Sequence, residues 1–379
     1  MNFIYLDNHA TTPIDDQVLE AMSSVGFGNP HSSGHAIGWR ASSLVETARE
    51  EVASLIGADV DEIFFTSGAT EANNLAILGI RKFASVGSNH VARSNIEHKS
   101  VLAACDALAN EHGFRISAIE TDKQGFVQPE AVSSAIDERR TVLISVGIVN
   151  NEIGTIQDIG VIRDACKRAF LHCDAAQAPE AISMKGTADL CDMLSLSAHK
   201  MRGPMGIGAL YISRSMQRSI SPLMFGGGQQ NGVRPGTLPV HLCVGMGAAS
   251  KLAANNQIER LRTAALRDEF LQQLRAFGIS FKLNGTTDSS RRHPGNANLY
   301  LPGIDAEHLI GLLQPNLAIS TGSACTSGIL EPSHVLTGIG LTADEASSSI
   351  RIGIGPRTKR DEVITASSMI AAAVKELRP

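Results

Sequence analysis

Short β-rich runs alternate with helical patterns between residues 62 and 213, and this alternation constrains the fold more than any other feature of the chain. Helical patterns such as EANNLAILGIRKFA and KSVLAACDALANEH separate the first of these runs. The runs are EIFFT, HVARS, FRISAI, TVLISVGIV, FLHCD, DMLSLS and IGALYI. Strands that alternate with helices form βαβ units, which build a mostly parallel sheet. The sequence therefore predicts an α/β fold.

A long amphipathic pattern follows in the segment IERLRTAALRDEFLQQLRAF. Its apolar side chains predict a helix with one buried stripe, made by Ile258, Leu261, Ala265 and Leu274. Strand and helix patterns continue to the end of the chain and predict a second, smaller layer. The segment SKLAANNQI, at residues 250–258, marks the expected joint between the two parts.

Charge and composition exclude two classes of function. The 379 residues carry a net charge of −5, aromatic residues make up 4%, and Trp39 is the single tryptophan, so neither a basic groove nor a stacking platform for nucleic acid is visible. No apolar run approaches the roughly 18 residues that a membrane span needs. The opening MNFIYLDNHATTP indicates a short strand and a turn rather than a cleavable signal. We expect a cytoplasmic protein that contacts neither nucleic acid nor membrane.

The cysteines are scattered and show no C-x-x-C spacing, which argues against both a disulfide framework and a zinc knuckle. They are Cys105, Cys166, Cys173, Cys191, Cys243 and Cys325. Most of them are expected to be buried structural thiols. His31 and His35 have the i,i+4 spacing of a metal pair, but the segment NPHSSGH is too rich in Pro and Gly to be helical. We expect no metal site.

Polar clusters follow five of the predicted strands. These clusters are Ser67–Glu71, Asn95–Lys99, Asn150–Glu152, Asp174–Gln177 and Ala198–Lys200. Ligands of open α/β sheets bind at the carboxyl ends of the strands, so the clusters are expected to meet at one rim. Each cluster alone is weak support, because polar turn residues commonly follow strands.

The turn from Ser67 to Thr70 opens a predicted helix, so its backbone N–H groups and the Thr70 hydroxyl can hold a phosphate. The alternative is a simple helix cap at Thr70. No G-x-x-x-x-G-K-[ST] motif occurs, and no G-x-G-x-x-G follows a strand. The ligand is therefore expected to be smaller than a nucleoside triphosphate or a dinucleotide.

Asp174 and Lys200 suggest what carries that phosphate. A carboxylate at a strand end suits the ring nitrogen of pyridoxal phosphate, and a lysine amine in a partly dry cleft can form a Schiff base with its aldehyde. His98 and His199 can lie against the ring or the phosphate and shuttle protons. The alternatives are ordinary ones: a turn cap for Asp174, a solvated turn residue for Lys200, and capping or surface roles for the histidines.

Nine motifs together closely resemble the cysteine desulfurases of the NifS/IscS type, of the class V aminotransferase family. In order they are YLDNHATTP, TSGATEANN, IEHKSVL, VNNEIGTIQDI, HCDAAQA, SAHKMRGPMGIGALY, GGGQQNGVRPGTLPV, STGSACTSG and SSSIRIGIG. The resemblance runs from about residue 4 to about residue 370 and implies pyridoxal-phosphate fold type I. That fold would have a large domain over residues 15–255 with a mostly parallel seven-stranded sheet. A smaller α+β domain over residues 1–14 and 256–379 would carry a catalytic cysteine loop.

The resemblance also implies roles for single residues. Lys200 would hold the cofactor covalently, Asp174 would pair with the pyridine nitrogen, and Gln177 would reach the ring hydroxyl. His98 would stack on the ring and handle protons. The implied phosphate ligands are Ala69, Thr70, Ser197 and His199, with Thr237 reaching across from a second subunit. Asn151 and Arg351 would bind the substrate carboxylate. A homodimer is therefore expected.

Cys325 lies in STGSACTSG, residues 320–328, where no bulky apolar neighbour could help to bury it. The resemblance implies that this thiol takes the sulfur of L-cysteine as a persulfide, leaving L-alanine. A loop of small residues suits a nucleophile that must then move to a partner. That partner would be a sulfur-acceptor protein, either an iron-sulfur scaffold or a thiolation enzyme, and the sequence does not choose between them.

Two other functions remain open from the residues. An aminotransferase or another lyase of the same fold would keep Lys200 and Asp174 but would not need Cys325. A protein that kept the fold without catalysis would be expected to lose the lysine or the aspartate, and both are present.

Overall fold

The computed structural model describes residues 3–321 and 331–378, so Cys325 lies outside the described residues. Its centre is a seven-stranded sheet in the order β2-β8-β7-β6-β5-β3-β4. The strands are β2 (Ile63–Thr66), β3 (His90–Ser94), β4 (Arg115–Ile119), β5 (Thr141–Ser145), β6 (Phe170–Asp174), β7 (Met193–Ser197) and β8 (Gly208–Ile212). Neighbours from β4 to β7 are parallel, and β8 is antiparallel to both β7 and β2. The predicted mostly parallel sheet is confirmed.

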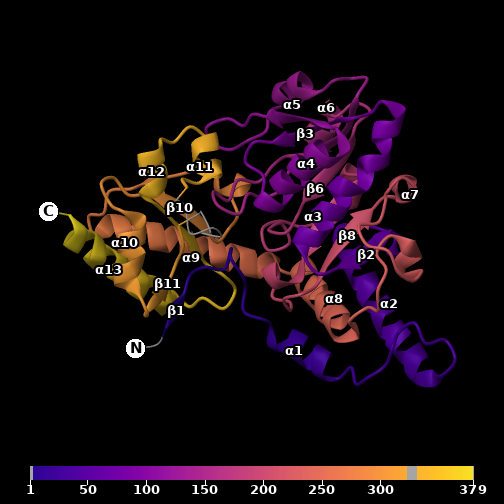
Figure 1. The fold of residues 1–379 in the computed structure, drawn as a ribbon. Coiled ribbons are helices and arrows are strands. Elements are labelled where there is room, and N and C mark those ends of the chain that lie inside the picture. The colour runs from indigo at the N-terminus through magenta and orange to yellow at the C-terminus, as the bar shows by residue number, and fades with distance from the viewer. Residues whose placement is uncertain (1–2, 322–330, 379) are drawn as a thin grey trace.

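Helices cover both faces of this sheet (Figure 1). The helices of this part of the chain are α1 (Asp16–Ser23), which packs on α8, and α2 (Ala36–Ile56), α3 (Ala69–Leu78), α4 (Lys99–His112), α5 (Pro129–Ala135), α6 (Ile159–Ala165), α7 (Arg214–Gln217) and α8 (Val240–Ala254). Adjacent residues of one strand enter different hydrophobic cores, as Met193 and Leu194 do. A sheet that is buried on both faces requires the near-continuous apolar runs from which its strands were predicted.

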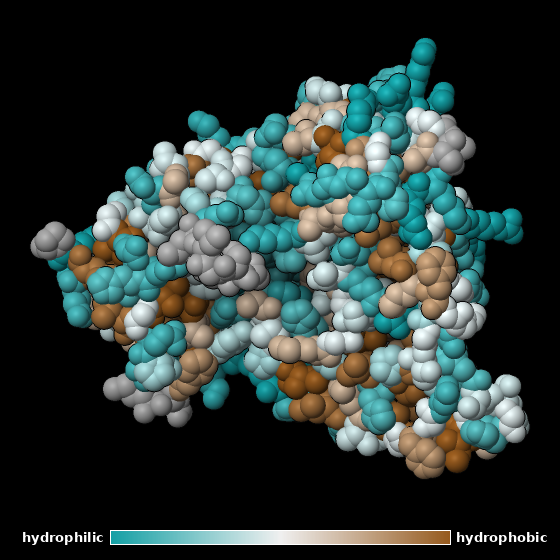
Figure 2. Space-filling model, viewed as in Figure 1, coloured by the Kyte–Doolittle hydropathy of each residue, from teal (hydrophilic) through white to brown (hydrophobic). Residues whose placement is uncertain are grey.

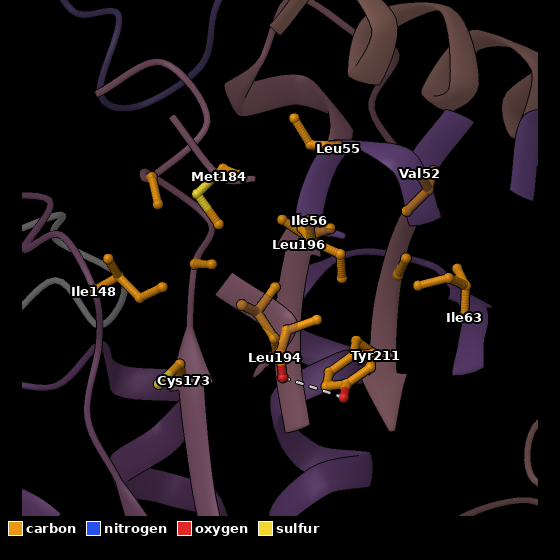
Figure 3. Close-up of a cluster of buried hydrophobic side chains, with 14 of the residues drawn as sticks. Val52, Leu55, Ile56, Ile63, Ile148, Cys173, Met184, Leu194, Leu196 and Tyr211 are labelled. Carbon is orange, nitrogen blue, oxygen red and sulfur yellow. Dashed lines mark hydrogen bonds between the residues drawn. The ribbon is translucent and has the colours of Figure 1, made fainter. Parts of the chain in front are cut away.

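One core lies between the sheet and α2 (Figure 3). Val52 and Ile56 of α2 pack in the same cluster as Leu194 and Leu196 of β7. The other core packs α3 and α4 against the opposite face, with Leu75 and Leu108 in the same cluster as Phe64 and Val91. Burial on both faces fixes the positions of the strand ends, where the polar clusters begin.

Helix α2 begins and ends at residues that suit its termini. The ring Nδ1 of His35 accepts a hydrogen bond from the backbone N–H of Gly38 at 3.1 Å and caps the first turn. Gly57 ends the helix in the left-handed region, with φ at 78°. His35 is thus a helix cap, which leaves the metal-pair interpretation of His31 and His35 without support.

The outer edge of β2 is bonded by side chains instead of a strand, by Arg49 at the Ile63 carbonyl and by Gln230 at Phe65. The amide of Gln230 accepts from the backbone N–H of Phe65 at 2.7 Å and donates to the carbonyl of Phe65 at 2.9 Å. Gln230 itself has a positive φ of 49°. Its side chain therefore pairs with the edge as a peptide group of a further strand would.

A second group of elements lies beside the large sheet (Figure 1). It contains an antiparallel sheet of β12 (Ser349–Gly353), β10 (Asn296–Tyr300) and β9 (Lys282–Leu283), and a parallel pair of β1 (Ile4–Tyr5) and β11 (Leu317–Ala318). Its helices are α9 (Gln257–Ala276), α10 (Ala306–Leu313), α11 (His334–Gly338), α12 (Ala343–Ser347) and α13 (Arg360–Leu377). Ile4 and Leu6 share a hydrophobic core with residues from 266 to 374. The domain limits predicted at residues 14/15 and 255/256 stay a prediction.

Helix α9 forms where it was predicted, but of the four side chains predicted to be buried, Leu274 enters the core and Ile258, Leu261 and Ala265 are exposed. Ile258 and Leu261 are 80% and 67% exposed. Leu266, Phe270 and Leu274, spaced four residues apart, enter the core together with Leu271. The apolar residues of the first turns lie on another face of the helix, so the periodicity misplaced the contact. Among the described residues, no helix is long and apolar enough to cross a membrane.

Candidate active site

A pocket of about 500 Å³ lies at the carboxyl ends of the central strands. All five polar clusters predicted from the sequence contribute to its wall. Of the predicted site residues, those that line it are Ala69, Thr70, His98, Asn151, Asp174, Gln177, Ser197, His199 and Lys200. Because these strands run parallel, their ends meet at one rim and bring distant parts of the chain together.

The start of α3 forms one end of the pocket. Gly68 occupies the N-cap position with φ at 154°, and no side chain among the described residues caps the helix there. The alternative in which Thr70 caps this helix is therefore wrong. The first N–H groups of α3, at Ala69 and Thr70, are left as donors beside Ser197 and His199. This end of the pocket fits a phosphate.

Asp174 is held by hydrogen bonds to both of its carboxylate oxygens. Oδ1 accepts from the backbone N–H of Ala176 at 2.9 Å, and Oδ2 accepts from Nδ2 of Asn73 at 2.7 Å. The carboxylate lies at the end of β6 and lines the pocket. A fixed carboxylate in this position fits a protonated ring nitrogen.

Lys200 reaches into the same pocket from the turn after β7. Its Nζ donates to the backbone carbonyls of His9 and Ala10. Burial lowers the pKa of the Lys200 amine to about 8, with a further lowering from Arg351 and partial opposition from Asp7. An amine of this pKa is neutral often enough near pH 7 to act as a nucleophile.

The two predicted histidines are held in different ways. Nδ1 of His98 accepts from the backbone N–H of Ser100 at 3.2 Å, so His98 caps α4. Nδ1 of His199 lies 3.1 Å from the Thr11 hydroxyl. Burial lowers the pKa of both imidazoles, to about 4 for His199, where Lys200 adds to the effect. Both rings are neutral at pH 7.

Of the predicted site residues that the structure describes, Arg351 and Thr237 do not line the pocket. Arg351 lies in β12 behind its wall, where Nη2 pairs with Asp7 at 2.8 Å and Nη1 donates to the carbonyl of Asn151 at 3.1 Å. Thr237 is exposed on the surface. Cys325 falls outside the described residues. The other five cysteines are buried, as predicted.

Two features of the site were missed at the level of sequence. Glu97 lines the pocket and accepts from the backbone N–H of Gly147 at 2.9 Å, and burial raises the pKa of its carboxyl to about 8. The backbone carbonyl of His9 binds both Lys200 and Nε2 of Gln177. Glu97 belongs to a predicted polar cluster, so the sequence could have identified it. The role of the His9 carbonyl could not be predicted, because every residue has a backbone carbonyl. Among the described residues, no group of three or more His, Cys, Asp or Glu could hold a metal ion.

A mostly parallel sheet with a lysine, an aspartate and an uncapped helix start around one pocket fits the class V aminotransferase type of enzyme. The model of that family, Aminotransferase class-V, matches residues 4–365. Cysteine desulfurase IscS of Ehrlichia chaffeensis is 44% identical over 99% of this chain and 92% of its own length. The chain therefore belongs to the class V aminotransferase family, in its group of NifS/IscS-type cysteine desulfurases.

Solved structures agree with this assignment. A NifS-like protein superposes with a TM-score of 0.89 at 31% identity, covering 99% of this chain and 100% of that one. The structure of SspA in complex with cysteine gives a TM-score of 0.80 at 34% identity, covering 94% and 100% of the two chains. The fold is thus shared along almost the whole length.

Proposed function

We propose that this cysteine desulfurase uses pyridoxal phosphate to convert L-cysteine to L-alanine and passes the sulfur to Cys325. The observation that carries the proposal is the meeting of Lys200, Asp174 and the uncapped start of α3 in one pocket. The membership of the family, with relatives named cysteine desulfurase, supports the choice of reaction. The solved complex of SspA with cysteine supports the choice of substrate.

The residues present fit the cofactor. Lys200 would hold its aldehyde carbon, and Asp174 would pair with its ring nitrogen. Gln177 would contact the ring hydroxyl, while His98 would lie against the ring face. The phosphate would bind at the start of α3, with Ser197 and His199 beside it. When bound, the cofactor supplies an electron sink for carbanions next to the substrate amine.

Asn151 and Arg351 are proposed to bind the substrate carboxylate. Asn151 lines the pocket, and its carbonyl accepts from Arg351, which places the guanidinium directly behind the wall. Arg351 is buried and already pairs with Asp7. A substrate carboxylate would share this guanidinium with Asp7, since a planar guanidinium can bind two carboxylates.

Sulfur transfer balances without an outside oxidant or reductant. L-cysteine and the Cys325 thiol give L-alanine and a Cys325 persulfide, as the S–S bond forms and the C–S bond of the substrate breaks. The persulfide sulfur then passes to an acceptor protein, an iron-sulfur scaffold or a thiolation enzyme. We place the reaction in the cytoplasm, where thiols stay reduced.

A homodimer is proposed to complete the site. Large apolar side chains are exposed around α1 and the segment that leads to α2, where Figure 2 shows hydrophobic side chains on the surface. Phe27 is 84% exposed and Trp39 is 60% exposed. Phe225 is 86% exposed, in the segment that precedes Thr237. Exposed apolar surface of this kind supports an interface, from which Thr237 would reach the phosphate of the partner.

The variant Cys325→Ser tests the function. It should bind pyridoxal phosphate and keep the holoenzyme absorbance, yet release almost no sulfide from L-cysteine and carry no persulfide. The five buried cysteines provide the control, because each changed singly to Ala should keep activity as far as folding survives. Wild-type turnover by Cys325→Ser would instead point to a general lyase or an aminotransferase.

A further inference from the structure

Four side chains form a continuous hydrogen-bonded chain behind the pocket wall. Oδ2 of Asp174 lies 2.7 Å from Nδ2 of Asn73, and the same Nδ2 lies 2.9 Å from Oγ of Ser100. Oγ of Ser100 lies 2.8 Å from Nδ1 of His98. Asp174 and His98 line the pocket, whereas Asn73 and Ser100 are buried behind it. These hydrogen bonds connect the end of β6 to the first turns of α3 and α4.

The direction of each hydrogen bond follows from the chemistry of its ends. A carboxylate oxygen accepts, so Asn73 must present its NH₂ group to Asp174, and its second N–H donates to Ser100 Oγ. The hydroxyl of Ser100 then has its own proton left to give to Nδ1 of His98. Within these hydrogen bonds, Asn73 donates to Asp174 and to Ser100, and Ser100 donates to His98.

A second contact requires the same state of His98. The backbone N–H of Ser100 points at Nδ1 of His98 at 3.2 Å, and a backbone N–H can only donate. Two donors meet at Nδ1, so this nitrogen carries a lone pair and the ring proton is on Nε2. Nε2 has no hydrogen-bond partner among residues 3–321 and 331–378, which leaves it as the ring nitrogen free to meet a ligand.

We infer that Asn73 and Ser100 are positioning residues that hold His98 as the neutral tautomer with its proton on Nε2, so that His98 meets the substrate as a hydrogen-bond donor. The identity of the substrate in this inference rests on the proposed function. The tautomer of His98 rests only on the hydrogen bonds described above. A base that takes a proton at Nε2 needs the opposite tautomer, with the proton on Nδ1, and both Ser100 contacts oppose that tautomer.

A donor role agrees with the position of His98 at the start of a helix. His98 caps the 14-residue helix α4, whose positive end disfavours an imidazolium. Burial lowers the pKa of His98, and Lys200 and Lys99 add to this while Asp174 opposes it. A neutral imidazole at a helix start can polarise a substrate by donating from its free N–H. The proton of the Cys325 or substrate thiol would then need another acceptor.

The tautomer can be read directly in the protein without cofactor. Histidine labelled with ¹⁵N, observed through long-range ¹H–¹⁵N correlation at pH 7, distinguishes a protonated nitrogen from one with a lone pair. His98 should show a protonated Nε2 and an unprotonated Nδ1, its signals being assigned by their loss in His98→Gln. A protonated Nδ1, or an imidazolium, would overturn the inference.

Ser100→Ala tests the hydroxyl while the backbone N–H stays. The Nδ1 signal of His98 should shift, and Ser100→Thr should restore it. Ser145→Ala is the matched control, because Ser145 Oγ lies at the same 2.8 Å from Nδ1 of the buried His172, outside the pocket. Ser145→Ala should move the signals of His172 and leave those of His98. Unmoved His98 signals in Ser100→Ala would contradict the hydroxyl contact.

A double-mutant cycle tests whether Asn73 acts through Ser100. In the holoenzyme, Ser100→Ala should lower kcat for L-cysteine about fivefold, the equivalent of one net hydrogen bond, with a smaller change in KM. Asn73→Leu should lower it at least as much, since Asp174 loses a donor too. The double variant should lose less than the product of the two single losses. A fully multiplicative loss would contradict the coupling.

The measurements on apo-protein and on holoenzyme test this inference and the proposed function separately. The tautomer is measured in apo-protein, so it stands or falls without any desulfurase activity. If the wild-type holoenzyme did not desulfurate L-cysteine, the proposed function would fail and the apo-protein spectra would still decide the state of His98.

Discussion

The surroundings of Lys200 lower the pKa of its amine and so favour the neutral, nucleophilic form. Burial disfavours the charged ammonium, and the carbonyls of His9 and Ala10 hold Nζ in place. Both carbonyls belong to the segment that follows β1. The reactive amine therefore depends on the packing of a segment that is distant in sequence.

The lowered pKa gives a measurable expectation for Lys200. In apo-protein its amine should reach half of its maximal reactivity toward acetic anhydride near pH 8, because deprotonation creates the nucleophile and burial has lowered the pKa from 10.5. Competitive labelling followed by peptide mass spectrometry measures this, with the exposed Lys123 as the reference for the reagent itself. A midpoint near 10.5 for Lys200 would contradict the description of this pocket.

Single residues were predictable where they follow strands. Asp174, His98 and Lys200 come directly after predicted strands, and the rule that ligands bind at carboxyl ends placed them in one pocket. Asn73 was not predicted, because a buried amide inside a helix leaves no pattern that distinguishes it from an exposed one. The pairing of Arg351 with Asp7 joins positions more than 300 residues apart and depends on the tertiary fold.

At the scale of elements, the outer edge of β2 depends on Gln230. Both backbone groups of Phe65 on that edge are satisfied by one amide, which also accepts from Arg49 at 3.2 Å. An unpaired backbone group that stays buried costs about 1–3 kcal/mol. Gln230 therefore satisfies the Phe65 part of an edge whose Ile63 carbonyl accepts from Arg49 at 2.5 Å.

Gln230→Ala should lower the free energy of unfolding by about 2–4 kcal/mol, because it leaves the N–H and the carbonyl of Phe65 without partners. Urea unfolding of the apo-protein measures the change. Gln128→Ala is the control, since that amide bonds Asp122 on the exposed surface and its loss should cost under about 0.5 kcal/mol. Equal effects of the two substitutions would show that the edge contact is not important for stability.

The elements were predictable to different degrees. The inner strands of the large sheet were found because burial on both faces makes them largely apolar runs, whereas β4 at the edge is mostly exposed or half-buried. The location of α9 was found from its pattern, but its buried face was not, since Ile258 and Leu261 are apolar and yet exposed. Periodicity indicates that a helix exists, whereas the neighbouring helix decides which side is covered.

At the scale of the whole molecule, buried titratable groups set how stability depends on pH. Burial lowers the pKa of His172 to about 4 and of His293 to about 3, so protonation below pH 6.5 favours the unfolded chain. Burial raises the pKa of Glu97 to about 8 and of Glu152 to about 7. These carboxyls keep their protons in the folded protein, and their contribution to stability is lost as the pH rises from 4.5 through those values.

Between pH 4.5 and 6.5 the two histidines and the two carboxyls act in opposite directions, and above pH 6.5 the carboxyls act alone, so the apo-protein should lose stability from pH 6.5 toward pH 8. Each carboxyl contributes a slope of up to about 1.4 kcal/mol per pH unit while only its folded form is protonated. Urea unfolding across this range measures the curve. Glu152→Gln should flatten the alkaline side, whereas Glu130→Gln, an exposed substitution, should not. A free energy of unfolding that keeps rising up to pH 8 would contradict the raised pKa values of Glu97 and Glu152.

The pairing of β1 with β11 has a consequence for the order in which a newly made chain can fold. Ile4 pairs with Leu317 and Tyr5 with Ala318, so this contact closes a loop of about 310 residues. On the ribosome the large sheet can assemble while β11 is still unmade, because its strands lie between residues 63 and 212. The segment that carries the His9 and Ala10 carbonyls is held at its start by this pairing and by the bond from the Asn8 N–H to the Gly353 carbonyl at 3.1 Å, so its contacts with Lys200 reach their final form once those residues are made. A nascent chain interrupted before residue 317 would thus carry the lysine without its final surroundings, and it should retain cofactor poorly.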